Sequence, residues 1–228
     1  MDLNGFEKEI GVNFNNKGLL KQAFIHRSYI NENKGEGLEH NERLEFLGDA
    51  VLELVVTNFL FNKYPKKPEG ELTSLRSALV NTTTLSKTAS SLGANDLLHL
   101  SKGEGRDTGR ARQFILANTY EAIVGAIYLD QGYDSAKGFI ENTIFHLIDE
   151  IVDKELWKDA KSRLQELAQE KFSLTPNYKV SKEEGPDHNR IFTVGVYFGG
   201  KLVAEGRGES KQEAQQEAAN KALEVKGW

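Results

Sequence analysis

Four acidic residues stand at regular spacing inside a mostly apolar stretch of the chain: Glu42, Glu45, Asp49 and Glu53. The spacing is i, i+3, i+7 and i+11, so on an α-helix of about 3.6 residues per turn all four project from one side. Carboxylates without partners in an apolar setting are costly or shift their pKa, so the pattern predicts a cationic partner. Oxygen ligands of this kind suit a divalent metal ion.

A second polar pair interrupts another apolar run, residues 114–129, much later in the chain. Asn118 and Glu121 are spaced i and i+3, so they share one face of the predicted helix. Small Ala and Gly neighbours would let this helix approach another helix closely. If the two helices face each other, the row of acids and this pair form the two halves of one metal site.

The elements that must position these groups have local signals of their own. Asn41 is a favourable N-cap for a helix that starts at Glu42, and Pro65 predicts that this helix ends before it. Residues 68–70 read as a turn, and 26–29 as a helix end with a basic last turn. Further helices are predicted over 3–10, 16–23, 72–80, 84–92 and 136–152.

The segment 101–112 is rich in glycine and arginine. Two interpretations stay open for it: a flexible, solvated loop, or a backbone clamp beside a phosphate-bearing substrate.

Composition limits the chemistry and the partners. The 228 residues include no cysteine, which excludes a disulfide scaffold, a thiol nucleophile and a cysteine zinc site. We find no signal peptide pattern and no apolar run of about 18 residues, so we expect a soluble, cytoplasmic protein without a membrane partner.

The net charge of −5 argues against nucleic acid as a partner, but residues 161–227 carry 11 basic and 10 acidic side chains. The acidity is therefore concentrated in the first part of the chain.

The pattern of apolar residues changes after about residue 155, from helical spacing alone to a mixture of helical spacing and strand-like alternation. An amphipathic helix over 161–172 is followed by alternating strands, a Gly199-Gly200 hairpin and a closing helix capped by Ser210. The fold class is therefore multi-domain, with an all-α domain over 1–153, a linker over 154–160 and an α+β domain of order α-β-β-β-α over 161–228.

The run Asn41-Glu42-Arg43-Leu44-Glu45-Phe46-Leu47-Gly48-Asp49 resembles the signature of the ribonuclease III family. The second part resembles a double-stranded RNA-binding domain, and the two resemblances cover nearly the whole chain in the bacterial order. They imply a homodimeric endoribonuclease that uses Mg²⁺, with Mn²⁺ as a substitute, to cut double-stranded RNA. Implied products carry 5′-phosphates, 3′-hydroxyls and short 3′ overhangs, and implied substrates are rRNA precursors and other structured transcripts.

The resemblance also assigns roles to individual residues. The implied catalytic carboxylates are Glu42, Glu45, Asp49 and Glu121. The implied metal ligands are Glu45, Asp49, Asn118 and Glu121. Phe46 matches an aromatic residue that docks into the partner subunit, with a plain core residue as the alternative, and Glu69 matches a further acid in the loop after the long helix. Glu53 lies outside the motif and is either a solvated acid or an extension of the site.

One residue departs from the family pattern. The family has Asp where this chain has Asn118, and an amide keeps a carbonyl oxygen but loses the negative charge. The expectation is an active site that binds Mg²⁺ less tightly. The alternative function is a double-stranded RNA-binding protein with a degenerate active site.

By the same resemblance, six residues of the second part contact RNA: Gln165, Glu166, His188, Lys211, Gln212 and Gln215. Such domains recognise the minor grooves of A-form RNA and the phosphates between them. The family's three-lysine cluster is reduced here to Lys211, so we expect weaker and less salt-sensitive binding.

Overall fold

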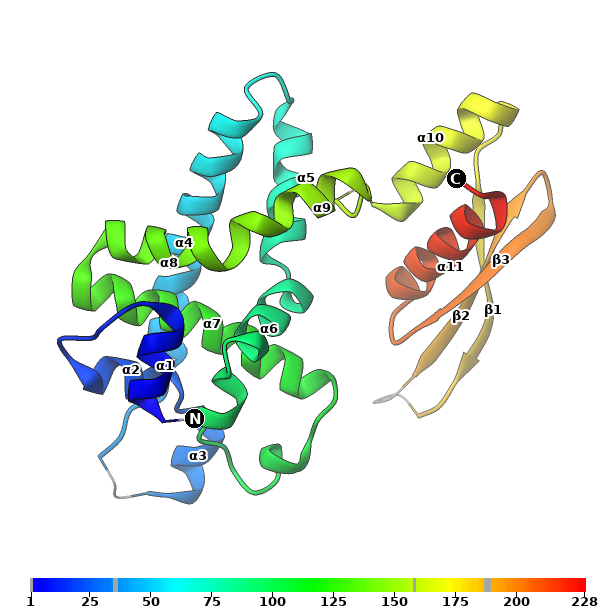
Figure 1. The fold of residues 1–228 in the computed structure, drawn as a ribbon. Helices are drawn as coiled ribbons and strands as arrows, with labels where there is room; N and C mark the ends of the chain where they lie inside the picture. The colour runs from blue at the N-terminus through cyan, green and yellow to red at the C-terminus, as the bar shows by residue number, and fades with distance from the viewer. Residues whose placement is uncertain (1, 35–36, 158, 187–189) are drawn as a thin grey trace. The chain divides into compact units, whose positions relative to one another are not determined.

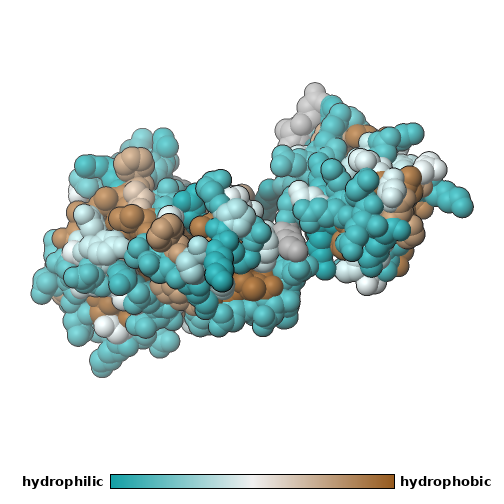
Figure 2. All heavy atoms as spheres, turned by 90° about the horizontal axis from the view of Figure 1, so that it is seen from above, coloured by the Kyte–Doolittle hydropathy of each residue, from teal (hydrophilic) through white to brown (hydrophobic). Residues whose placement is uncertain are grey.

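The computed structural model describes residues 2–34, 37–157, 159–186 and 190–228. The chain forms two compact units, residues 1–157 and 158–228 (Figure 1). In the described part of the chain, no helix is long and apolar enough to cross a membrane. Figure 2 shows apolar side chains reaching the surface of both units among hydrophilic ones.

The first unit is helical, as predicted. Its helices are α1 (Leu3–Ile10), α2 (Lys17–Ala23), α3 (Arg27–Glu32), α4 (Glu42–Lys63), α5 (Glu69–Val80), α6 (Thr82–Ser91), α7 (Arg110–Gln131), α8 (Tyr133–Ile144) and α9 (Ile148–Asp153). Short 3₁₀ turns occupy η1 (Ala94–Leu97), η2 (Glu104–Arg106) and η3 (Phe145–Leu147). The two longest helices, α4 and α7, are the two that carry the polar groups singled out above.

Helices α4 and α7 touch through their backbones. A Cβ atom added at Gly48 would lie 1.8 Å from the carbonyl oxygen of Glu121, and one added at Gly125 would lie 2.2 Å from that of Leu44. Only glycine permits this approach, because any side chain would drive the helices apart. The crossing places Glu45 and Asp49, which flank Gly48 in sequence, next to Glu121.

Two local predictions for the part of this unit after α4 are wrong. Residues 68–70 do not form a separate turn, since α5 begins at Glu69 directly after the extended Pro68, and acidic residues in its first turn favour that start. The single helix predicted over 136–152 is broken at η3. There Phe145 stacks on Phe59 of α4 with ring centroids 3.7 Å apart, so a tertiary contact overrides the helical periodicity.

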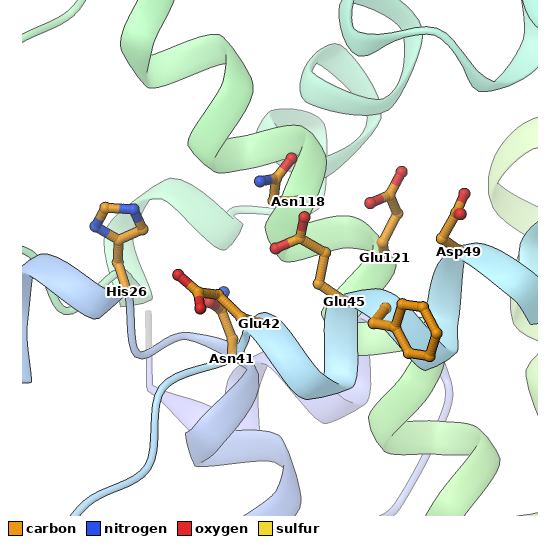
Figure 3. Close-up of a pocket in the computed structure, with 8 residues that line it drawn as sticks. His26, Asn41, Glu42, Glu45, Asp49, Asn118 and Glu121 are labelled. Carbon is orange, nitrogen blue, oxygen red and sulfur yellow. The ribbon is translucent and has the colours of Figure 1, made fainter.

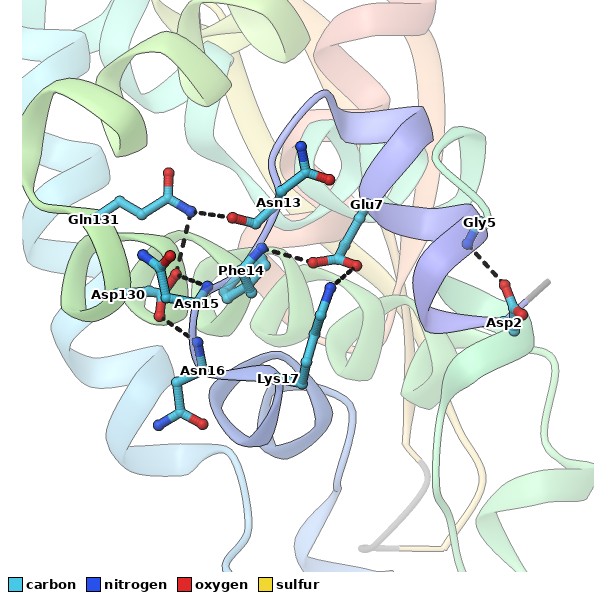
Figure 4. A network of polar contacts seen from close by, with 10 residues as sticks. All are labelled: Asp2, Gly5, Glu7, Asn13, Phe14, Asn15, Asn16, Lys17, Asp130 and Gln131. Carbon is cyan, nitrogen blue, oxygen red and sulfur yellow. Dashed lines mark hydrogen bonds and ion pairs between the residues drawn. The ribbon is translucent and has the colours of Figure 1, made fainter.

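The N-terminal segment is tied to the carboxyl end of α7 (Figure 4). The carboxylate of Asp130 accepts hydrogen bonds from the backbone amides of Asn15 and Asn16, both at 2.8 Å. Glu7, which is only 3% exposed, accepts a bond from the Phe14 amide at 2.6 Å. All of these bonds satisfy backbone donors of the connection between α1 and α2, and those of Asp130 fix that connection against the far end of the helix that carries Glu121.

The second unit consists of α10 (Ala160–Phe172), β1 (Asn177–Glu184), β2 (Ile191–Phe198), β3 (Lys201–Gly208) and α11 (Lys211–Lys226). Its three strands form an antiparallel sheet of order β1-β2-β3. Positive φ angles at Gly199 and Gly200 make the tight hairpin between β2 and β3. Ser210 caps α11 by accepting a bond from the Glu213 amide. The predicted α-β-β-β-α fold is confirmed.

Alanines let α11 lie directly on the sheet. Ala214, Ala218, Ala219 and Ala222 are fully buried. A Cβ atom at Gly206 of β3 would lie 2.1 Å from the backbone nitrogen of Ala218. This close packing fixes the direction of α11 on the sheet.

Candidate active site

A pocket of about 360 Å³ lies where α4 and α7 cross (Figure 3). The residues that line it are His26, Asn41, Glu42, Glu45, Phe46, Asp49, Asn118 and Glu121. Glu45 and Asp49 come from α4, whereas Asn118 and Glu121 come from α7. The structure therefore brings together the two polar groups that are more than 60 residues apart in sequence.

The pocket holds more negative charge than it can stabilise alone. Burial, together with the charges of Asp49, Glu45 and Glu53, raises the pKa of Glu121 to about 8. Burial and the charges of Glu42 and Asp49 also raise the pKa of Glu45, against a hydrogen bond from the Asn118 side chain that lowers it. Raised carboxyl pKa values of this origin mark a site that gains stability when a cation binds.

The donor set fits a hard divalent cation. Carboxylate and amide oxygens are the ligands that Mg²⁺ and Ca²⁺ prefer, and the pocket offers four carboxyl groups and the Asn118 amide. Among the described residues, no three His, Asp or Glu side chains stand close enough to enclose a metal ion by themselves. Mg²⁺ commonly keeps several waters and binds through one or two carboxylates together with substrate phosphates, so this open arrangement suits it.

Glu42 lies at the edge of the pocket near basic groups. Its carboxylate is 3.7 Å from the guanidinium of Arg27 and 3.6 Å from the ring of His40. Asn41 precedes α4 as predicted, but its side chain makes no capping hydrogen bond to any amide of the described residues. Its amide is buried and donates to the carbonyl of Ala23 at 3.0 Å, which ties the start of α4 to α2.

Two further acids lie apart from the pocket. Glu53 pairs with Arg76 of α5 at 2.8 Å, so it extends the acidic face without lining the cavity. Glu69 lies at the start of α5, where it accepts a bond from the Thr73 hydroxyl at 3.0 Å and lines a separate surface pocket with Phe61. Within one chain, neither acid joins the carboxylate cluster.

Sequence reasoning did not assign His26 to the site. The prediction of a helix end at 26–29 is wrong, because His26 is the N-cap residue of α3 and its ring accepts a bond from the Ser28 amide at 3.3 Å. Histidine is not one of the residues that usually cap helices, so the sequence carries no clear signal for this N-cap.

The glycine-rich segment is more ordered than a free loop. Arg112 folds back onto it and donates to the carbonyls of Glu104 and Gly105 at 2.8 and 3.2 Å. It also donates to the side chain of Asn95 at 3.1 Å. Arg112 therefore holds the shape of this segment.

The candidate RNA contacts of the second unit lie on two helices. Gln165 and Glu166 are exposed on α10, and Lys211 and Gln212 are exposed in the first turn of α11. The ammonium group of Lys211 lies 3.2 Å from Glu183. Gln215 is half-buried and accepts a bond from Lys161 at 2.7 Å. His188 lies outside the described residues.

Comparisons with known proteins find a matching family for each of the two units. A family model described as ribonuclease-III-like matches residues 16–148, and one for the double-stranded RNA-binding motif matches residues 160–226. The chain is similar to Ribonuclease 3 of Carboxydothermus hydrogenoformans, with 47% identity over 98% of this chain and 95% of that protein. It is also similar to Ribonuclease 3 of Geobacillus kaustophilus, with 48% identity over 96% of this chain and 89% of that protein.

Among solved structures, the first unit is similar to the nuclease domain of ribonuclease III from Campylobacter jejuni, described for flexibility in a region involved in dimer formation. The identity is 40% and the TM-score 0.56, over 62% of this chain and 98% of that domain.

Proposed function

Because this chain belongs to the ribonuclease III family, we propose that it hydrolyses both strands of duplex RNA with Mg²⁺ and leaves 5′-phosphates, 3′-hydroxyls and short 3′ overhangs. Its general activity is that of a double-stranded-RNA endoribonuclease that needs a divalent metal ion. The observation that carries the finer proposal is the carboxylate pocket at the crossing of α4 and α7. Precursors of rRNA are proposed substrates, and the cytoplasm is the proposed site of action.

The proposed chemistry assigns each pocket residue a task. Glu45, Asp49 and Glu121 would hold the metal ion together with the waters it keeps, and Asn118 would offer its carbonyl oxygen. A bound divalent ion supplies positive charge for the phosphorane-like transition state and lowers the pKa of a coordinated water. In the proposed reaction, a water oxygen would attack phosphorus and lose a proton, while the bond to the 3′ oxygen would break and that oxygen would take up a proton, which gives the proposed ends. Glu42 would keep Arg27 and His40 at the mouth of the pocket.

Incubation with long duplex RNA tests this function directly. We expect short duplexes with 5′-phosphates in Mg²⁺ or Mn²⁺, and binding without cleavage in Ca²⁺. Intact RNA under all conditions, with binding retained, would instead favour the binding-only alternative.

Asn118→Asp is expected to tighten the metal site. The substitution adds a charged oxygen ligand where the amide now contributes a neutral one, so the Mg²⁺ concentration at half-maximal cleavage should fall. The substitution also removes the amide donor whose hydrogen bond now lowers the pKa of Glu45. Mg²⁺ titrations of cleavage measure the effect, with Asn58→Asp in α4 as a control for charge alone. An unchanged midpoint in Asn118→Asp contradicts the proposed ligand role.

We propose a homodimer formed through the outer face of α4. Phe46, Leu54 and Phe61 are 82%, 58% and 68% exposed, and their spacing places them along one side of the helix. An exposed apolar stripe of this kind is typical of a protein interface.

Phe46→Asp is expected to shift the protein toward monomers, because burying the new charge in the interface is unfavourable. Sedimentation velocity measures the change. Leu129→Asp, at an exposed apolar position on α7, provides the control and should leave the oligomeric state unchanged. Equal sedimentation of Phe46→Asp and the natural chain would place the interface elsewhere.

Gln212→Lys is expected to strengthen RNA binding and its salt dependence. Gln212 is exposed in the first turn of α11, where free amides and the helix dipole favour phosphate. One added phosphate contact should steepen the slope of log K against log salt by about 0.9. Binding is measured in Ca²⁺ across salt concentrations, with Gln169→Lys on α10 as the control. A slope that stays constant would exclude this helix end from the RNA interface.

A further inference from the structure

The ring of His26 is held rigidly at the edge of the carboxylate pocket (Figure 3). Its backbone amide donates to the carbonyl of His99 at 3.1 Å, and the His99 amide donates to the carbonyl of Phe24 at 2.9 Å. On the other side, the Asn41 amide donates to the carbonyl of Ile25 at 2.9 Å. The segment before α3 is thus fixed to the start of α4, so the ring keeps its place relative to Glu42 and Glu45.

Hydrogen bonds determine which ring nitrogen carries the proton. The Ser28 amide can only donate, and it points at Nδ1 of His26 at 3.3 Å. The Ser28 hydroxyl lies 2.8 Å from the same nitrogen and accepts a bond from the Ser101 amide at 3.0 Å, so its own proton is available for Nδ1. Nδ1 is therefore an acceptor, and the neutral ring carries its proton on Nε2.

The environment favours the neutral form of the ring. Burial lowers the pKa of His26, against the charges of Glu104 and Glu42, which raise it. Within the described part of the chain, Nε2–H has no hydrogen-bond partner. His26 thus presents a single unused donor to the pocket.

His26 supplies a hydrogen-bond donor, which the other side chains of the pocket do not offer. Once a cation holds the pocket's carboxyl groups in the ionised form they can only accept hydrogen bonds. The Asn41 amide already donates to the Ala23 carbonyl, and the Asn118 amide already donates to Glu45. The RNA backbone carries anionic acceptors that carboxylates repel. The charged Arg27 pairs with Glu42 at the pocket edge. The neutral N–H of His26 forms no such ion pair, so it can donate directly to a phosphate oxygen.

We propose that the Nε2–H of His26 donates a hydrogen bond to a phosphate oxygen of the RNA strand that enters the pocket, and that Ser28 and Ser101 set the tautomer that makes this bond. The inference rests on the proposed function. It makes His26 a substrate-binding residue that orients the strand beside the metal ligands.

Two substitutions separate this role from that of the N-cap. In His26→Asn, the side-chain oxygen can still cap α3, but the amide donor falls short of the Nε2 position. In His26→Gln, an amide donor reaches that position, but the cap is lost. We expect His26→Asn to keep the melting temperature and lose about 10- to 100-fold in single-turnover cleavage, the range for a hydrogen bond to a charged group. His26→Gln should melt lower and cleave faster than His26→Asn.

A purely structural role predicts the opposite order of activity, so an Asn variant that cleaves like the natural chain overturns the inference. The exposed His146, which lines a different pocket, provides the control, and His146→Asn should change neither quantity. Failure of the natural chain to cleave duplex RNA would count against the proposed function, whereas the order of the two His26 variants tests this inference alone.

Discussion

Glu121→Gln is expected to reduce cleavage by more than about 100-fold, the scale on which preorganised charge at a reaction centre acts, and to raise the melting temperature of the metal-free protein. The loss of activity follows from the role of metal ligand that we propose for Glu121. The gain in stability follows from removing a carboxyl group that burial and the neighbouring charges of Asp49, Glu45 and Glu53 disfavour. Strain of this kind is typical of functional sites.

The stability gain has a definite dependence on pH. In the folded protein the pKa of Glu121 is raised from 4.5 to about 8, so the folded state holds its proton more tightly than the unfolded state. That contribution to stability is present below about pH 4.5 and is lost as pH rises toward 8. Glutamine stays neutral, so the advantage of the variant should be small at acidic pH and largest above pH 8.

Thermal melting in EDTA across this pH range measures the gain, and adding Mg²⁺ should raise the melting temperature of the natural chain more than that of the variant. Glu141→Gln in α8 is the matched control, since Glu141 pairs with Lys137, does not line the carboxylate pocket and should affect cleavage little. Normal cleavage by Glu121→Gln, or equal metal-free stabilities at high pH, would refute the assignment of Glu121.

Gly48→Ala is expected to destabilise the first unit and inactivate the pocket together. The new methyl group would lie 1.8 Å from the Glu121 carbonyl oxygen, and both groups belong to helix backbones that cannot move alone. Overpacking of this kind costs about 1–3 kcal/mol or more, which lowers the melting temperature by about 2–4 °C per kcal/mol in a chain of this size. Separation of α4 and α7 would also pull Glu45 and Asp49 away from Glu121.

Gly138→Ala supplies the matched control, because a Cβ atom there meets nothing within 4 Å. Alanine in an open helical position should stabilise the protein by up to about 1 kcal/mol. Calorimetry and cleavage assays on both variants distinguish a contact effect from a general effect of adding a methyl group. If the Gly48→Ala protein is as stable and active as the natural chain, the helix crossing can accommodate a methyl group and the close contact is not required.

Much of this site was predictable because its signals are local. The spacing of Glu42, Glu45 and Asp49 on one helix, and of Asn118 and Glu121 on another, predicted two polar faces, and the structure places both on one pocket. Caps and prolines set the helix bounds for the same reason.

Two failures are local, because the segments predicted as a turn at 68–70 and as a helix end at 26–29 are both starts of helices. The other failures concern contacts between distant segments. The row of acids does not show where α7 crosses α4, so it cannot tell that Glu53 lies past the crossing and meets Arg76. The break between α8 and α9 depends on Phe145 stacking against Phe59, 86 residues away in sequence. His26 reaches the pocket only because backbone bonds to His99 and Asn41 hold its segment in place.

The bonds between the N-terminal segment and α7 give the fold a second response to acidity, opposite in sign to that of the pocket. Burial would raise the pKa of Asp130 and of Glu7, but the amide bonds to Asp130, and the bonds of Lys17 and Phe14 to Glu7, lower both. Their stabilisation is present above the ordinary carboxyl range and is lost as pH falls through the lowered values. Acid therefore weakens the bonds that hold the end of α7 near Asp130, while it removes the charge repulsion around Glu121. Because the two effects oppose each other, the metal-free enzyme should be most stable at an intermediate pH.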